Sequence, residues 1–81
     1  MDIAAVTKKA IEETLGIDKG VDPNAKLVDL GCDEIDVMDI ILTVEEDLDI
    51  TIDTEDEEEL MAPGATVQTA IDLFTKLSTK S

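Results

Sequence analysis

Apolar residues recur every three or four positions at both ends of the chain, which predicts two amphipathic helices. The first is expected over residues 2–15 with Gly16 as its C-cap, and the last over residues 66–77 with Lys76 and Lys80 near its negative end. The side chains expected to face the core are Ile3, Val6, Ala10, Ile11 and Leu15 in the first helix, and Val67, Ala70, Ile71, Phe74 and Leu77 in the last.

A longer helix is expected over residues 34–48, where Asp33 is placed to cap the first turn and Asp36 to complete a capping box. This helix is apolar on more than one side. Its core stripe consists of Val37, Ile40, Ile41, Val44 and Leu48, and a second row consists of Ile35, Met38 and Leu42. The second row either packs under the preceding loop or forms a partly exposed contact patch rimmed by acids.

The remaining segments predict connections and one short helix. Residues 48–53 alternate apolar and polar side chains, but no partner strand is visible, so we expect an extended crossing segment. Residues 55–61 are expected to form a short acidic helix that ends before Pro63 and Gly64. The long loop over residues 16–32 has apolar side chains spaced to hold it on the core, namely Ile17, Val21, Leu27, Val28 and Leu30. These elements predict one all-α domain over residues 1–81, with three longer helices and one short helix.

Composition makes the expected core almost entirely aliphatic. The chain has 81 residues, of which 43% are hydrophobic, and Phe74 is its only aromatic residue. We expect Met38 and Met61 to add soft, adaptable packing, because an unbranched methionine side chain fits irregular gaps. Such a core could deform around an apolar guest.

The acidic residues are concentrated in the middle of the chain. The net charge is −15, and no Lys or Arg lies between Lys26 and Lys76, whereas sixteen of the twenty-one acids do. Nucleic acid is excluded as a partner, because binding phosphates requires clustered Lys and Arg and the chain has no Arg. Basic protein surfaces are the natural complement of this charge.

The residue types that most catalytic sites need are missing from the chain. It contains no His, Tyr, Trp or Arg, so we expect no enzymatic activity. The acids after Asp53 do not match the spacing of a calcium loop, so we expect no dedicated metal site and no cofactor. Cys32 is the only cysteine, and neighbouring acids should raise the pKa of its thiol, so we interpret it as a small apolar residue.

The same features bear on the compartment. One cysteine permits no internal disulfide and fits a reducing environment. Residues 2–15 lack the apolar run of a signal peptide, and no segment approaches the roughly 20 apolar residues of a membrane span. We therefore expect a complete, cytoplasmic chain, and we expect it to be a monomer.

Residues 29–36 read Asp-Leu-Gly-Cys-Asp-Glu-Ile-Asp, which resembles the prosthetic-group motif of acyl carrier proteins, Asp-Leu-Gly-x-Asp-Ser-Leu-Asp. In that family the serine hydroxyl carries a 4′-phosphopantetheine arm, and Glu34 stands at the position of this serine. A carboxylate cannot form the phosphodiester that attaches the arm. The only serines of the chain, Ser78 and Ser81, lie far from the motif in sequence.

The resemblance covers nearly the whole chain. Residues 44–48, Val-Glu-Glu-Asp-Leu, resemble the Leu-Glu-Glu-Glu-Phe of the family's second helix, and residues 66–72 resemble the start of its fourth helix. This chain has one residue fewer before Gly31, a few more between Asp53 and Thr66, and Asp53 in place of a usual proline. These differences fall in loops or at an element boundary, so the resemblance implies the four-helix bundle of acyl carrier proteins.

Carrier proteins present their second helix to their enzymes, so the resemblance favours an exposed contact patch on residues 34–48. It implies partners with basic surfaces among the enzymes of fatty-acid, polyketide or lipid assembly. The residues expected to bind these partners are Asp33, Glu34, Ile35, Asp36, Met38, Asp39, Leu42, Glu45 and Glu46.

Three functions follow as hypotheses. The leading one is a carrier-protein homologue that cannot be pantetheinylated at Glu34 and that scaffolds, titrates or regulates these enzymes through non-covalent contacts. The second is a genuine carrier of acyl thioesters whose serine was replaced, by engineering or in a divergent copy. The third is a protein whose aliphatic core binds a fatty acid or another apolar molecule without a covalent link.

Overall fold

The computed structural model describes residues 2–79 and has four α-helices and one short 3-10 helix. In chain order these are α1 (Ile3–Leu15), η1 (Val28–Leu30), α2 (Glu34–Leu48), α3 (Thr54–Met61) and α4 (Val67–Thr79). Within the described residues the only β-type pairing is an isolated bridge between Lys26 and Thr66. The predicted all-α bundle with three longer helices and one short helix is confirmed.

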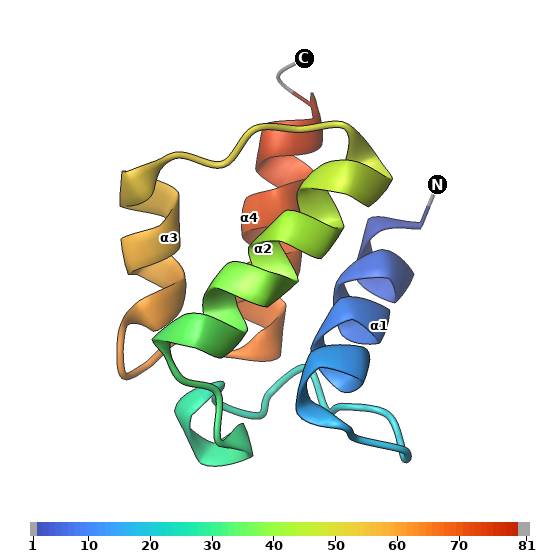
Figure 1. Cartoon of the computed structure of the whole chain (residues 1–81), viewed down its shortest axis with the longest axis vertical. Helices are drawn as coiled ribbons and strands as arrows, with labels where there is room; N and C mark the ends of the chain where they lie inside the picture. Colours follow the sequence, from blue (N-terminus) through green and yellow to red (C-terminus); the bar gives the residue numbers. More distant parts are fainter. Residues whose placement is uncertain (1, 80–81) are drawn as a thin grey trace.

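The helices enclose a single core. α1 packs against both α2 and α4, and the shorter α3 packs against α2 and α4 on the side away from α1 (Figure 1). The side chains of Phe74, Ile11, Val44 and Val67 are fully buried at the centre. Nearly all of the expected core residues of α1, α2 and α4 are buried or half-buried, because the spacing that defines an apolar stripe also aims it at neighbouring helices.

Four buried residues were not predicted, namely Thr7, Leu60, Ala65 and Leu73. Thr7 is fully buried in α1, where its hydroxyl donates a hydrogen bond to the Ile3 carbonyl oxygen at 2.8 Å and so has a partner inside the helix. Leu73 in α4 is also buried, because α4 is covered by α1 on one side and by α3 on the other. The apolar face of α4 is therefore wider than its stripe of expected core residues.

The expected methionine packing is wrong. Met38 is 46% exposed and Met61 is 38% exposed, so neither side chain belongs to the core. α2 turns its Val37 and Val44 face inward and leaves Met38 on its outer side, whereas α3 buries only Leu60. The core of the described residues is built from branched aliphatic side chains, alanines and Phe74, and the deformable packing argued from methionine is absent from it.

The long loop is held on the core as predicted, with one exception. Val21 and Leu27 are buried and Ile17 and Leu30 are half-buried, but Val28 is 49% exposed, so its expected anchoring role is wrong. The reason is the 3-10 turn, in which the inward positions are taken by Leu27 and Leu30.

Backbone hydrogen bonds also join this loop to the start of α4, which the sequence did not indicate. The Leu27 N–H donates to the Ala65 carbonyl oxygen at 2.9 Å, and the Val67 N–H donates to the Ala25 carbonyl oxygen at 3.0 Å. The loop is therefore fixed to α4 by its backbone as well as by its apolar side chains.

The segment between α2 and α3 is extended, as predicted, and its two isoleucines, Ile50 and Ile52, are half-buried against the core. α3 begins one residue before the expected start, because the Asp53 carboxylate accepts a hydrogen bond from the Asp56 N–H at 3.0 Å and caps the helix. α4 ends two residues later than expected. Lys76 lies in its last turn, as predicted, and Lys80 lies outside the described residues.

Candidate functional site

The start of α2 is shaped by a reciprocal pair of carboxylates. The Asp36 N–H donates to Asp33 Oδ1 at 2.9 Å, and the Asp33 N–H donates to Asp36 Oδ2 at 3.3 Å. This is the predicted capping box, and it satisfies backbone donors that the first turn of a helix otherwise leaves free. Both carboxylates are therefore occupied in holding the helix terminus.

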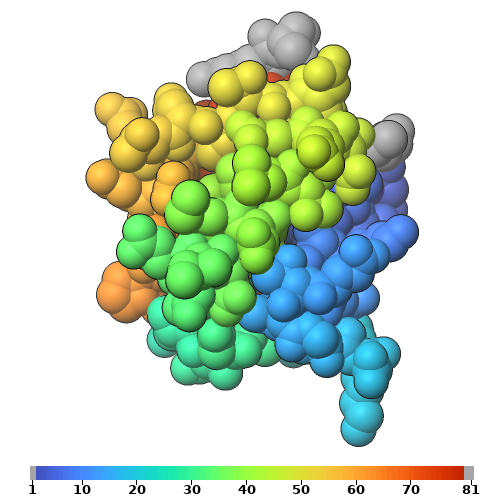
Figure 2. Space-filling view, in the orientation of Figure 1, coloured from blue at the N-terminus to red at the C-terminus, as the bar shows by residue number. Residues whose placement is uncertain are grey.

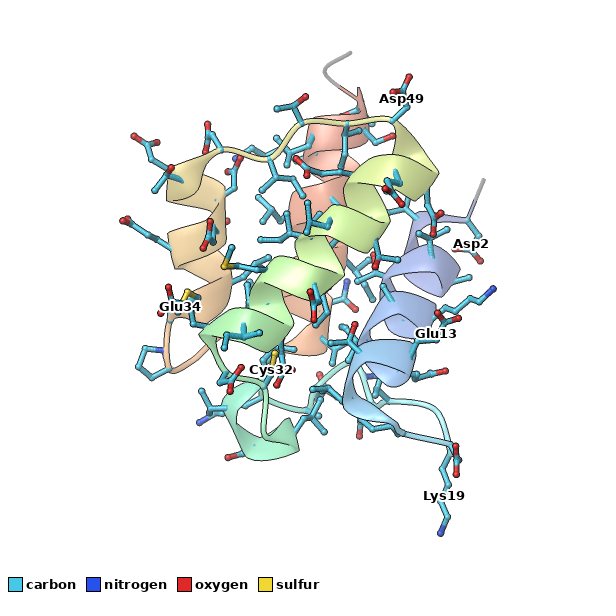
Figure 3. The ribbon with its side chains drawn as sticks, in the orientation of Figure 1. Asp2, Glu13, Lys19, Cys32, Glu34 and Asp49 are labelled. Carbon is cyan, nitrogen blue, oxygen red and sulfur yellow. The ribbon has the colours of Figure 1, made fainter. Side chains whose placement is uncertain are left out.

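Glu34, the first residue of α2, is exposed and has no such task. Among residues 2–79 its carboxylate has no hydrogen-bond or ion-pair partner. Figure 3 shows Glu34 and Cys32 at the same end of the bundle, whereas Asp49 marks the opposite end of α2. The negative side chain lies at the positive end of the helix dipole, which stabilises its charge.

A hollow of about 100 Å³ lies beside Glu34, between η1, the first turn of α2 and the last turn of α3. Gly31, at φ +83°, closes η1 in the left-handed region that favours glycine. After Gly31 the chain turns back toward the start of η1, where the Cys32 N–H donates to the Leu27 carbonyl oxygen at 3.1 Å. Val28 and Cys32 form one wall of the hollow, and Leu60 and Met61 form the opposite wall.

The thiol of Cys32 lies in this hollow and is chemically quiet. Partial burial, and then the negative charges of Asp36 and Asp33, raise the pKa of the Cys32 thiol to about 11. The expected direction is confirmed, and burial is the larger cause. The thiol stays protonated near neutral pH, and the thiolate that would act as a nucleophile is scarce.

The second apolar row of α2 faces solvent. Ile35 is 70% exposed and Leu42 is 57% exposed, and Met38 lies between them, so the row does not pack under the loop; its exposure is confirmed, and its role as a contact patch stays a prediction. In the space-filling view α2, in green to yellow-green, runs diagonally across the face of the molecule (Figure 2). A second hollow, of about 200 Å³, lies between this row and the extended segment, lined by Met38, Leu42 and Ile52 among others.

The acids expected to bind partners are spread along α2 and do not converge on one point. Asp33, Glu34 and Asp36 lie at its start, Asp39 is exposed in its middle, and Glu45 and Glu46 lie in its last two turns. Glu45 is half-buried, and its Oε2 accepts a hydrogen bond from the Ile52 N–H at 2.9 Å, so it also holds the extended segment. The nine expected residues form a ridge along one helix.

None of the described lysines belongs to α2. Lys8 and Lys9 are in α1, Lys19 and Lys26 are in the following loop, and Lys76 is in α4. Figure 3 shows Lys19 extending from the bundle on the side of α1. The only ion pair among the described residues is the exposed contact of 3.9 Å between Lys9 and Glu13. The negative charge of η1, α2 and α3 is therefore not balanced from within these elements.

A family model described as phosphopantetheine attachment site matches residues 6–74. The chain belongs to this phosphopantetheine-attachment family. The match covers all of α2 and the turn before it, and extends from the first half of α1 into α4, in agreement with the acyl-carrier resemblance of the sequence. Carrier domains of this kind are not themselves catalytic and interact with biosynthetic enzymes. No solved structure was found to match the chain.

The residues at the start of α2 do not fit a covalently attached phosphopantetheine. Attachment needs a hydroxyl oxygen, and residues 33–37 contain none. Ser78 lies near the C-terminal end of α4, at the opposite end of the bundle from the start of α2 (Figure 1), and Ser81 lies outside the described residues. In the described part of the chain, no helix is both long and apolar enough to cross a membrane.

Proposed function

We propose that this protein is a carrier-domain homologue without the arm, which acts by non-covalent contact with enzymes of fatty-acid, polyketide or lipid assembly. The observation that carries the proposal is the free, exposed carboxylate of Glu34 at the first position of α2, where the resemblance of residues 29–36 to the family motif implies the attachment serine. The family supplies the carrier fold, and Glu34 removes its covalent chemistry. What remains is a surface for partners.

The composition of α2 supports this surface. Ile35, Met38 and Leu42 form an exposed apolar row, and exposed acids such as Asp39 and Glu46 lie beside it. An apolar centre with a charged rim is the usual composition of a protein interface. The acids favour partners with Lys- and Arg-rich surfaces and should accelerate encounter with them. The protein would compete with armed carriers for the same enzymes, or hold those enzymes together.

Attachment of the arm is the direct test. The purified chain is incubated with coenzyme A and a broad-specificity phosphopantetheinyl transferase, and its intact mass is measured. We expect no change in mass for the natural chain, because its first turn of α2 offers no hydroxyl. A gain of one phosphopantetheine would overturn the proposal.

The variant Glu34→Ser helps to distinguish the proposed non-covalent role from that of a carrier whose attachment serine has been replaced. If the rest of the motif is still recognised, Glu34→Ser gains the arm under the same conditions. Asp39→Ser is a matched control, because it places a serine on the same helix with the same loss of charge but outside the motif. A chain that is modified only as Glu34→Ser keeps the recognition surface of a carrier, which the proposed competition for carrier enzymes requires.

Direct binding of an apolar molecule has weaker support. The hollow of about 200 Å³ beside Met38 and Leu42 is smaller than the roughly 300–1,000 Å³ typical of ligand pockets. The core, in turn, lacks the methionine packing that was expected to make it deformable. Titration with a medium-chain fatty acid, followed by amide chemical shifts of core residues such as Val44 and Phe74, distinguishes this role, since surface docking would leave these shifts unchanged.

A further inference from the structure

The exposed apolar residues of the molecule lie on one side of the bundle. The large apolar residues of the described chain that are clearly exposed belong to η1, α2 and α3, and none belongs to α1 or α4. Three of them are the row Ile35, Met38 and Leu42. The other two, Val28 and Met61, lie outside this row, on opposite walls of the hollow beside Glu34. The contact surface therefore continues past α2 around this hollow.

The hollow has the size and the walls for one side chain. Its volume of about 100 Å³ is small for a ligand pocket, and its lining includes the buried apolar side chains of Leu27, Val37 and Leu60. The rim is different, because Asp33 and Glu34 border it. A long side chain that is aliphatic along its stem and charged at its tip matches this gradient from apolar wall to acidic rim.

The charges around the hollow have one sign. Its charged lining residues are Asp33 and Glu34, and no lysine borders it among the described residues. One oxygen of Asp33, Oδ1, already accepts from the Asp36 N–H, whereas among the described residues both carboxylate oxygens of Glu34 are free to take new donors. The pKa of the Cys32 thiol is raised first by burial and then by Asp36 and Asp33, which agrees with the negative charge placed around the hollow.

We infer that the hollow between η1 and α3 receives an arginine side chain of a partner protein, with its methylene stem between Val28 and Met61 and its guanidinium group on the Glu34 carboxylate. Arginine fits better than lysine, because its planar group can form two parallel hydrogen bonds with one carboxylate and is less strongly hydrated. The inference rests on the proposed function for the existence of a partner. It adds to the expected partner-binding role of Glu34 the group that its carboxylate would bind and the hollow that would hold the stem of that group.

The test uses two short peptides on the full chain. Acetyl-Leu-Arg-Leu-amide is titrated into the isotope-labelled protein, and its citrulline counterpart, which has nearly the same shape but no charge, is titrated in parallel. We expect the arginine peptide to shift the backbone amides of Val28, Glu34 and Met61 and to bind about twofold to fivefold more tightly than the citrulline peptide, the range for an exposed charge pair.

Three variants test which residues produce this preference. Glu34→Gln should abolish the preference for arginine, whereas Glu58→Gln, which removes an equal charge from an exposed position of α3 outside the hollow, should keep it. Met61→Ala should weaken the binding of both peptides, because the side chain expected to contact the stem is lost. These side chains are exposed, so the variants should remain folded, which melting by circular dichroism verifies.

Three results would overturn the inference: equal binding of the two peptides, an equal effect of Glu58→Gln and Glu34→Gln, or no effect of Met61→Ala. The outcome is separable from the proposed function. A protein that ignores both peptides but stays unmodified by the transferase keeps the proposed function and loses only the arginine site. A protein that gains the arm loses the proposed function whatever the peptides do.

Discussion

The side chain of Glu45, in the last two turns of α2, accepts a hydrogen bond from the backbone N–H of Ile52, with 2.9 Å between Oε2 and N. The bond joins α2 to the extended segment between α2 and α3. Among the described residues this segment pairs with no strand, so its backbone N–H and C=O groups need other hydrogen-bond partners. It also explains why an acid is half-buried beside an apolar hollow.

Glu45→Ala should therefore destabilise the fold. Loss of the acceptor leaves the Ile52 N–H without its partner, and we expect a decrease of about 1–2 kcal/mol in the free energy of unfolding, measured by urea denaturation. Glu45→Gln keeps an acceptor oxygen, so its free energy of unfolding should decrease by less than that of Glu45→Ala. Glu46→Ala, next to it but exposed, is the matched control, and a loss equal to that of Glu45→Ala would show that the hydrogen bond contributes nothing specific.

The two neighbouring residues Leu60 and Met61 should respond very differently to truncation. Leu60 is the buried residue of α3, and Leu60→Ala should cost about 2–5 kcal/mol through lost burial and a residual cavity. In a domain of this size that loss approaches the whole stability. Met61→Ala, at the surface, should change the free energy of unfolding by less than about 1 kcal/mol. Similar unfolding midpoints for the two variants would contradict the packing of α3.

Stability should fall at alkaline pH because of Cys32. The folded protein holds the pKa of this thiol at about 11, above its ordinary value of 9.0, so the folded state favours the protonated form. This contribution is fully present below about pH 9 and is lost as the pH rises toward 11, because the unfolded chain releases the proton first. Urea unfolding at pH 8, 9 and 10 measures the effect.

The informative quantity is the difference in the free energy of unfolding between the natural chain and Cys32→Ala at each pH. We expect the advantage of the natural chain to shrink between pH 8 and pH 10. An advantage that stays constant would show that the thiol titrates normally in the folded state. Slow reaction of Cys32 with iodoacetamide at pH 8, compared with the urea-unfolded chain, would agree with the raised pKa.

Screening of the acidic side of the bundle should stabilise it. Sixteen of the acids lie between Lys26 and Lys76, and they repel more strongly in the folded state than in the expanded chain. We expect the melting temperature to rise with added NaCl, and to rise more with MgCl₂ at equal ionic strength, in melts followed by circular dichroism. A melting temperature that is unchanged by both salts would mean that the solvent already screens the repulsion between these acids.

The boundaries of the helices were largely determined by the sequence, because they depend on interactions between residues close in the chain. Asp33 and Asp36 form a capping box over three residues, and Gly16 ends α1 in the left-handed conformation that glycine adopts without strain. The same locality explains why the apolar stripe of α2 and the position of Glu34 at its first turn could be read from spacing alone. The family match over residues 6–74 agrees with the acyl-carrier resemblance of residues 29–36.

The fate of individual apolar side chains was decided only by the tertiary structure. Met38, Met61 and Val28 are as apolar as the residues that were buried, and their exposure depends on which faces α1, α3 and α4 happen to cover. The hollow beside Glu34 likewise joins η1 and α3, whose residues lie about thirty positions apart in sequence. Local patterns specify secondary structure and its ends, but such a meeting depends on how whole helices pack, because burial is a property of the neighbours that surround a side chain.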